Sequence, residues 1–187
     1  MPTGSVSPRR ADTRRNHESI LVVAAEALRR TGDVSYNGIA KLAGVGVGTV
    51  YRHFPTPEDL ILAVYQREVN HLIDIVPTLL ERQSPDNAFR VWVIDHLAHY
   101  MMTKRGLMTA LRAGPGELPT HTYKSLLDAL DTLRKANVEA GLIRADLTVE
   151  TLMRGLGGLM FLDPEGNWKA DTKALVDLLW AGMRAQV

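Results

Sequence analysis

Cysteine and long apolar runs are both absent from this chain of 187 residues. Without cysteine, the chain can form no disulfide, no thiolate zinc site and no thiol redox sensor. The N-terminus lacks the apolar core of a signal peptide, and no apolar stretch approaches the roughly 20 residues of a membrane-spanning helix. Strand-like alternation and internal repeats are missing too. We therefore expect an all-α, cytoplasmic protein with no membrane partner.

The net charge of +1 is small, but the charged residues are unevenly distributed. Residues 1–54 hold 8 Lys and Arg against 4 Asp and Glu, a net charge of +4. Residues 55–187 hold 14 basic against 17 acidic residues, a net charge of −3. A basic head on an acidic body suits a protein that presents one face to phosphate, although ordinary scatter of surface charge is the alternative.

Residues 1–15 are predicted to form a flexible basic arm, because they are rich in Pro, Ser, Thr and Arg and lack apolar periodicity. Such arms can reach a minor groove or the phosphates beside it. We expect weak, nonspecific attraction to phosphate, and the alternative is a solvated tail without function. The arginines concerned are Arg9, Arg10, Arg14 and Arg15.

The most informative stretch is 39–54, which has the pattern of a helix-turn-helix. Ala40 is small enough to let two helices cross closely, and Gly44 accepts the positive φ that a tight turn favours. Val50 is expected in the small core behind the turn. Ser35 is a good N-cap for the first helix of the pair. The second helix is then free to enter a DNA major groove.

The same stretch resembles the DNA-binding domain of the TetR (tetracycline-repressor-like) family of bacterial transcriptional regulators. The resemblance covers roughly residues 16–65 and is carried by Ile39-Ala40-Lys41, Ala43-Gly44-Val45, Gly48-Thr49-Val50-Tyr51, His53-Phe54 and Leu60. It implies a helix-turn-helix domain at 16–55 and a helical effector-binding and dimerisation domain at 56–187, with about nine helices in all. It also implies a homodimer that binds a palindromic operator in double-stranded DNA.

The candidate DNA-contacting residues lie on or beside the second helix of the pair. Val47 can meet a thymine methyl group, Thr49 a phosphate or a base edge, and Arg52 a guanine edge or a phosphate. The resemblance implies that further side chains of the pair contact the DNA backbone. Gly46 stands where the family often has serine, so this helix begins without a side-chain cap. The predicted set is Lys41, Gly46, Val47, Thr49, Tyr51, Arg52 and His53.

Apolar periodicity predicts further helices after residue 55. One runs from Thr56 to Pro77, and a second, apolar around most of its circumference, opens at Ser84. A short helix is expected at 107–113, and the next one closes at Gly141.

Aromatic and methionine side chains on these helices can surround a mostly apolar pocket for an unknown small-molecule effector. This pocket rests on analogy with the family, and the alternative is a filled hydrophobic core. The candidate lining residues are Trp92, His96, Tyr100, Met101, Met108, Leu111, Tyr123 and Leu127.

His96 and His99 lie three residues apart on one predicted helix, with Asp95 beside them. They could coordinate a metal or act in acid–base chemistry. No second ligand cluster is apparent in the sequence, and a polar group lining an apolar pocket is the commoner interpretation of such histidines. We therefore expect no enzyme and no cofactor, and keep a helical metal-dependent enzyme as an alternative.

The last two predicted helices carry the candidate dimer interface. The first of them, which Thr148 can cap, contains three glycines. Each glycine inside a helix costs roughly 0.5–1 kcal/mol relative to alanine. We therefore expect another helix to approach closely at these glycines. The resemblance implies pairing with the same helices of a second subunit, and the alternative is packing within the chain. The candidate residues are Leu152, Gly155, Leu156, Leu159, Leu175, Leu178, Leu179 and Met183.

The function predicted from the sequence is sequence-specific transcriptional regulation, which in the resembling family is usually repression relieved by a small molecule. An effector-independent DNA-binding protein is the other alternative.

Overall fold

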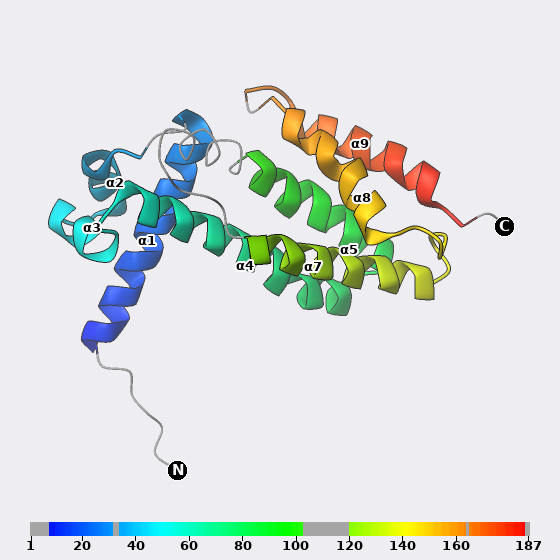
Figure 1. Ribbon diagram of the computed structural model, residues 1–187, viewed down its shortest axis with the longest axis horizontal. Helices are drawn as coiled ribbons and strands as arrows, with labels where there is room; N and C mark the ends of the chain where they lie inside the picture. The colour runs from blue at the N-terminus through cyan, green and yellow to red at the C-terminus, as the bar shows by residue number, and fades with distance from the viewer. Residues whose placement is uncertain (1–7, 32–33, 103–119, 164, 186–187) are drawn as a thin grey trace, which may run out of the picture. The chain divides into compact units, whose positions relative to one another are not determined.

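The computed structural model describes residues 8–31, 34–102, 120–163 and 165–185 (Figure 1). Regular secondary structure in these ranges is helical, and the β-type pairing they contain is an isolated bridge between Ile143 and Arg184. The predicted all-α fold is therefore confirmed. None of the helices in these ranges is long and apolar enough to cross a membrane.

The described chain divides into two compact units, one ending at Tyr65 and the other beginning at Gln66. The division falls inside helix α4 (Pro57–Arg82), so this one helix supplies residues to both units. The sequence places the domain boundary earlier, at the start of that helix. Each unit is described by itself below.

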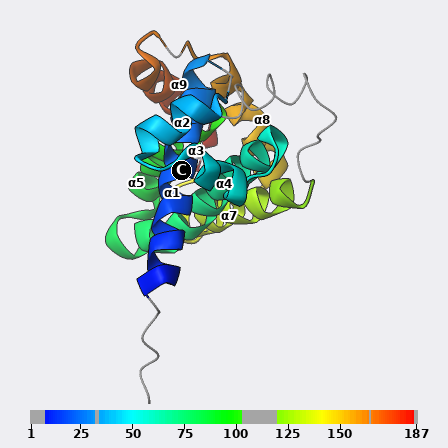
Figure 2. The same ribbon diagram turned by 90° about the vertical axis from the view of Figure 1, so that its left-hand side faces the viewer.

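The first unit contains α1 (Pro8–Thr31), α2 (Tyr36–Ala43), α3 (Val47–His53) and the beginning of α4 (Figure 2). Its core is made of apolar side chains from all four helices, with the largest contribution from α1. The buried members include Ile20, Leu28, Ile39, Val50, Phe54 and Leu60.

Helix α1 begins at Pro8, so residues 8–15, expected in a flexible arm, are helical. Proline at the first helical position has its φ already fixed near the helical value, and no glycine or second proline interrupts the stretch before Gly32. An ion pair one turn apart, between Asp12 and Arg15, adds to this first part of the helix. Residues 1–7 lie outside the described residues.

The turns of the first unit follow the local signals in the sequence. Ser35 caps α2, its Oγ accepting from the Gly38 N–H at 3.4 Å. Gly44 has φ 69° and ends α2, which the sequence also predicts. At the start of α4, the Asp59 N–H donates to Thr56 Oγ1 (3.2 Å) and the Thr56 N–H donates to Asp59 Oδ2 (3.1 Å).

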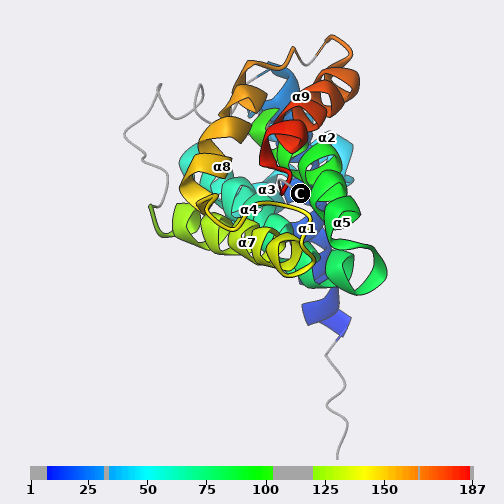
Figure 3. The same ribbon diagram turned by 90° about the vertical axis from the view of Figure 1, so that its right-hand side faces the viewer.

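The second unit contains the rest of α4, α5 (Pro85–Val91), the π-helical segment η1 (Trp92–Leu97), α7 (Thr120–Glu139), α8 (Val149–Leu156), the 3₁₀ segment η2 (Gly157–Phe161) and α9 (Trp168–Met183). Helices α8 and α9 lie side by side in the views of Figures 1 and 3. The core side chains that these elements bury most completely include Leu72, Phe89, Trp92, Leu97, Leu130, Leu133 and Leu156.

Helix α4 continues five residues past Pro77, where the sequence predicts its end, and stops at Arg82. Proline has no N–H, so the carbonyl of Ile73 loses its usual helical donor. Burial on either side of the proline outweighs that loss, because Val76 and Leu79 both pack into the core while Pro77 itself is exposed. Tertiary packing has overridden a local breaker signal.

The other helix ends of this unit match the sequence where they are described. Ser84 precedes α5 with Pro85 at its first position, and Thr148 caps α8 by accepting from the Thr151 N–H at 3.2 Å. Gly141 closes α7 with φ 68°. The short helix expected at 107–113 lies outside the described residues.

Candidate nucleic-acid interface

Helix α3 has one buried and one exposed face. Val50 and the following Phe54 are buried in the core of the first unit. On the other side, Val47 is 39% exposed and Tyr51 55% exposed, and Arg52 is exposed as well. Gly46 begins the helix with extended φ and ψ and no side-chain cap, as the sequence predicts. A short helix presented in this way fits the recognition helix of a helix-turn-helix.

Arg52 is folded back along α3 rather than extended into solvent. Its Nε donates to the Gly48 carbonyl at 3.1 Å, and its Nη2 donates to Thr49 Oγ1 at 2.9 Å. A guanidinium has five N–H donors, so three are left for phosphate or a base edge. The positive charge is therefore already held on the exposed face of the helix.

Tyr36 of α2 holds the C-terminal end of α3 in place. Its hydroxyl oxygen lies 2.8 Å from the Phe54 carbonyl oxygen and 2.6 Å from that of Thr56. Burial, together with the nearby Asp59 carboxylate, raises the pKa of Tyr36 to about 12, so the hydroxyl keeps its proton. The Tyr36 ring also packs against that of Tyr51, with centroids 4.7 Å apart, and so positions the exposed tyrosine.

His53, at the C-terminal end of α3, meets a residue of α1 that the sequence did not single out. The His17 ring lies edge-on to it at 5.4 Å and stacks on Phe54 at 5.0 Å. Burial lowers the pKa of His53, and the neighbouring His17 and Arg52 lower it further. A surface cavity of about 300 Å³ beside these rings is lined by Thr13, Arg14, His17 and His53.

The predicted contact residues therefore gather on one unit. Lys41, near the end of α2, is exposed, and the remaining six belong to α3 or cap it. His17 was missed because nothing in the sequence distinguishes it from other polar residues of α1; its contact with Phe54 joins residues far apart in the chain.

Comparison with known proteins agrees with this architecture. Residues 20–64 match the family described as "Bacterial regulatory proteins, tetR family". Residues 84–185, more than half of the chain, match the family described as "Transcriptional regulator SbtR-like, C-terminal domain". The chain belongs to the TetR family. It is a helix-turn-helix transcriptional regulator that binds DNA, as its sequence predicts.

Solved structures and curated relatives support the same assignment. A TetR transcriptional regulator from Streptomyces coelicolor is 34% identical, with a TM-score of 0.83 over 91% of this chain and 99% of that one. A TetR regulatory protein from Mycobacterium vanbaalenii is 31% identical, with a TM-score of 0.79 over 95% and 100%. An HTH-type transcriptional regulator from Staphylococcus aureus is 29% identical over 68% of this chain and 72% of that protein.

In this TetR-family chain, the residues predicted to line an effector pocket are placed in different surroundings. Trp92, Tyr100 and Met101 are buried in the core of the second unit, and the Trp92 indole N–H donates to the Leu72 carbonyl at 2.9 Å. Burial of these three side chains fits a filled hydrophobic core, which was the alternative to an effector pocket in the sequence analysis. The others differ in exposure: His96 and Leu127 are half-buried, Tyr123 is exposed, and Met108 and Leu111 lie outside the described residues.

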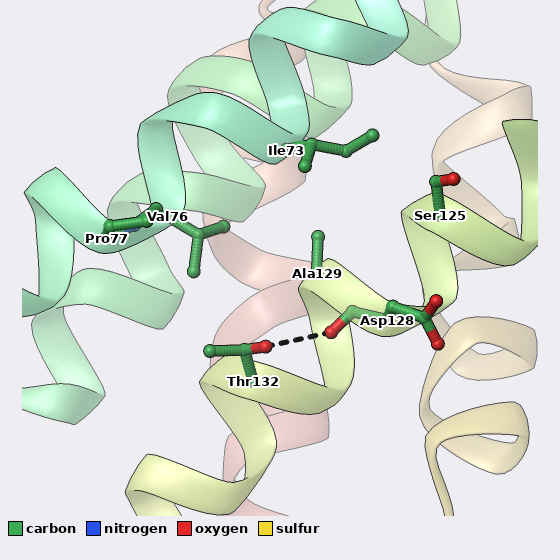
Figure 4. A pocket seen from close by; sticks show the side chains of 7 residues that line it. All are labelled: Ile73, Val76, Pro77, Ser125, Asp128, Ala129 and Thr132. Atoms are coloured by element: carbon green, nitrogen blue, oxygen red, sulfur yellow. Dashed lines mark hydrogen bonds between the residues drawn. The ribbon is translucent and has the colours of Figure 1, made fainter.

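A cavity of about 360 Å³ lies between α4 and α7 (Figure 4). None of the pocket residues predicted from the sequence lines it. Its walls are the side chains of Ile73, Val76, Pro77, Ser125, Asp128, Ala129 and Thr132. Pro77 was the sequence signal that could have pointed here, because it frees the carbonyl of Ile73 from the helical hydrogen-bond pattern beside the cavity.

His96 contacts His71 of α4, with His71 Nε2 and His96 Nδ1 3.0 Å apart. Burial, followed by the neighbouring His71, lowers the pKa of His96. His99, its expected companion, is exposed. Among the described residues, no three His, Cys, Asp or Glu side chains are grouped closely enough to hold a metal ion.

Two of the three glycines of α8 and η2 allow close packing within the subunit. A Cβ at Gly155 would lie 3.1 Å from Leu179 Cδ2, and one at Gly158 would lie 3.3 Å from Leu175 Cδ2. The close approach predicted from the sequence is thus made by α9 of the same chain. Of the remaining residues predicted for a dimer interface, Leu178 is exposed, whereas these are buried in the subunit: Leu152, Leu156, Leu159 and Met183.

Proposed function

We propose that this chain is a homodimeric repressor that binds a palindromic operator and is released from it by a small molecule. The observation that carries this proposal is the exposed face of α3, with its apolar, hydroxyl and guanidinium groups held over the buried core of the first unit. Two such helices, placed about 34–36 Å apart or a multiple of this, would read two half-sites in successive major grooves. Such an operator would be bound in the bacterial cytoplasm.

The side chains divide between base and backbone contacts. Val47 would meet a thymine methyl group, and Arg52 a guanine edge, once its hydrogen bonds to α3 have been exchanged for bonds to DNA. Thr49 would contact a base edge or a phosphate. Exposed Lys41 and Tyr51, together with His53, would contact phosphates, while Gly46 would let the backbone approach closely.

Exposed apolar side chains support dimerisation through the α8–α9 side of the second unit. Leu178 on α9 is 71% exposed, and Phe161, at the end of η2, is 89% exposed. Covering these two large apolar groups with a partner surface would be favourable, because it removes apolar area from water. Because a two-fold operator requires a two-fold reader, a second copy is the proposed partner.

The cavity between α4 and α7 supports the effector part of the proposal. Its volume of about 360 Å³ lies within the range of small-molecule sites, and its walls combine apolar side chains with hydroxyl groups and the carboxylate of Asp128. A ligand there would contact α4, whose first residues belong to the DNA-binding unit. Release requires that the ligand bind the DNA-incompetent state more tightly.

Selection of bound duplexes from a random DNA pool tests the DNA-binding part. We expect a palindrome whose half-sites reflect the spacing of two recognition helices. Lys41→Ala should weaken binding to all sequences and flatten the salt dependence by about one unit of slope, whereas Arg52→Ala should change which duplexes are recovered. Recovery of no enriched sequence, or of unpaired half-sites only, would refute the dimeric reader.

The effector part is tested by the affinity for the recovered operator with and without compounds that bind the cavity. Ala129→Trp would fill the cavity and serve as the matched control. A compound that saturates the wild type without changing operator affinity would rule out release through this site.

A further inference from the structure

We propose that Thr13, Arg14, His17 and His53 form a cradle for one DNA backbone phosphate, and that the imidazole of His53 makes operator binding stronger in mildly acidic than in mildly basic solution. This proposal rests on the proposed function, because it assigns α1 a place in the same DNA interface.

The geometry of the cradle comes from two helices that the chain separates widely. Three of its residues lie on one part of α1, and His53 ends the recognition helix α3. Together they surround the cavity of about 300 Å³. Their guanidinium, hydroxyl and imidazole groups are all hydrogen-bond donors, and phosphate oxygens are acceptors. The donor set therefore matches a phosphate placed beside the end of α3.

A buried ring holds the two imidazoles in place. His17 stacks on Phe54 with centroids 5.0 Å apart and ring planes 29° from parallel, and Phe54 is anchored in the core. His53 meets His17 edge-on at 5.4 Å. Donors held before the ligand arrives lose little conformational entropy on binding.

The charges around the cradle favour an anion. The groups that face His53 are His17 and Arg14 on α1 and Arg52 on its own helix. Burial lowers the pKa of His53, and His17 and Arg52 lower it further, so its imidazole is largely neutral at pH 7 before DNA arrives. On α1, the carboxylate of Asp12 is paired with Arg15.

A bound phosphate reverses this balance. Its negative charge favours the imidazolium and so raises the pKa of His53 on binding. At pH values between the pKa of the free protein and that of the complex, the complex therefore holds more protons than the separate partners. Affinity consequently rises as the pH falls through that window and levels off below it, by about tenfold for each unit that one pKa is raised.

The test is the dissociation constant for the selected operator at pH 8, 7 and 6 and constant ionic strength. We expect wild-type affinity to rise several-fold from pH 8 to pH 6, and His53→Gln to flatten this slope while leaving binding at pH 8 measurable. His71→Gln, a substitution in the other compact unit, should keep the wild-type slope. A His53→Gln variant with the full wild-type slope would overturn the proposal.

Arg14 and Arg15 provide a second, matched comparison, since each substitution to Gln removes one positive charge from the same helix. Arg14→Gln should lower the salt slope by about one, whereas Arg15→Gln should lower it less because Arg15 is paired with Asp12. Equal losses would count against a cradle at Arg14.

An NMR titration of the imidazoles in the wild type, free and bound to operator, needs no variant. We expect the pKa of His53 to rise in the complex; an unchanged value would overturn the proposal. If the wild type bound no duplex at any pH, the proposed function itself would fail, which distinguishes the two outcomes.

Discussion

The Tyr36 hydroxyl links the end of the recognition helix to the start of α4. One oxygen lies within hydrogen-bond distance of two carbonyls, those of Phe54 and Thr56, in a part of the chain that must hold α3 at a fixed angle. Because a hydroxyl carries a single proton, it donates to one carbonyl at a time. If the hydroxyl is removed, Tyr36 can donate a hydrogen bond to neither carbonyl.

Tyr36→Phe should therefore lower the free energy of unfolding by about 1–3 kcal/mol, the usual cost of leaving a buried polar group unsatisfied. Urea unfolding followed by circular dichroism measures this. Tyr51→Phe is the control: its ring is exposed, so stability should change by less than about 0.5 kcal/mol while operator affinity falls. Equal stability of the two variants would show that the Tyr36 bonds contribute little.

Two glycines near the recognition helix should respond to alanine with opposite signs. A Cβ would meet nothing within 4 Å at either Gly44 or Gly48, so crowding plays no part. Gly44 has φ 69°, where a Cβ is strained, and Gly44→Ala should cost about 1 kcal/mol or more. Gly48 lies inside α3, where Gly48→Ala should gain roughly 0.5–1 kcal/mol. Thermal unfolding of both variants checks the prediction, and a shared sign would contradict it.

Among the helices and turns, those with local signals were predictable and those set by packing were not. Ser35 and Gly44 each act on neighbours a few residues away, so their types alone specify a cap and a turn. Pro77 carried an equally local signal, but the burial of Val76 and Leu79 overrode it. That burial depends on helices far away in the sequence, which no single-sequence pattern reveals.

The sites follow the same division. The exposed residues of α3 could be named from the motif, because a recognition helix has a fixed inner and outer face. The α4–α7 cavity and the His17–Phe54 stack depend on how distant helices meet. The sequence instead paired His96 with His99 on spacing alone, whereas the structure places His96 against His71 of α4.

The His71–His96 contact makes the packing of η1 on α4 sensitive to acid. Burial lowers the pKa of His96 from its ordinary value of 6.5, and His71 and His99 lower it further against the opposing effect of Asp95. The unfolded chain therefore binds more protons between pH 6.5 and the lowered folded value. The stability that the neutral imidazole contributes is present above 6.5 and is lost as the pH falls through that window.

Urea unfolding at pH 7.5 and pH 5.5 should accordingly show lower stability at pH 5.5, with His96→Gln reducing the difference. His53, whose pKa is also lowered, contributes with the same sign, so part of the dependence should persist in that variant. A His96→Gln protein with the complete wild-type pH dependence would place its origin elsewhere.

For the whole molecule, assembly depends on a few exposed apolar side chains. Leu178→Glu and Phe161→Glu each put a charge on a group that is in solvent in the single subunit, so the subunit should fold normally. Across a subunit interface the same charge would be buried without a partner. Sedimentation velocity should show monomers at concentrations where the wild type is dimeric, with weaker operator binding.

Val22→Glu is the control, because Val22 is another exposed apolar residue but belongs to the first unit. It should leave the assembly state unchanged. If both interface variants dimerised like the wild type, the dimer interface would have to lie on another surface.

Because helix α4 belongs to both compact units, we expect the two units to unfold together on heating. Leu60 and Val64 are core residues of one unit, and Leu72 and Val76 are core residues of the other, all on one unbroken run of helical backbone. Unfolding of either unit would disrupt part of helix α4 and so destabilise the helix that the other unit also contains. Calorimetry should accordingly record one heat-absorption peak rather than two, with matching van 't Hoff and calorimetric enthalpies per cooperative unit.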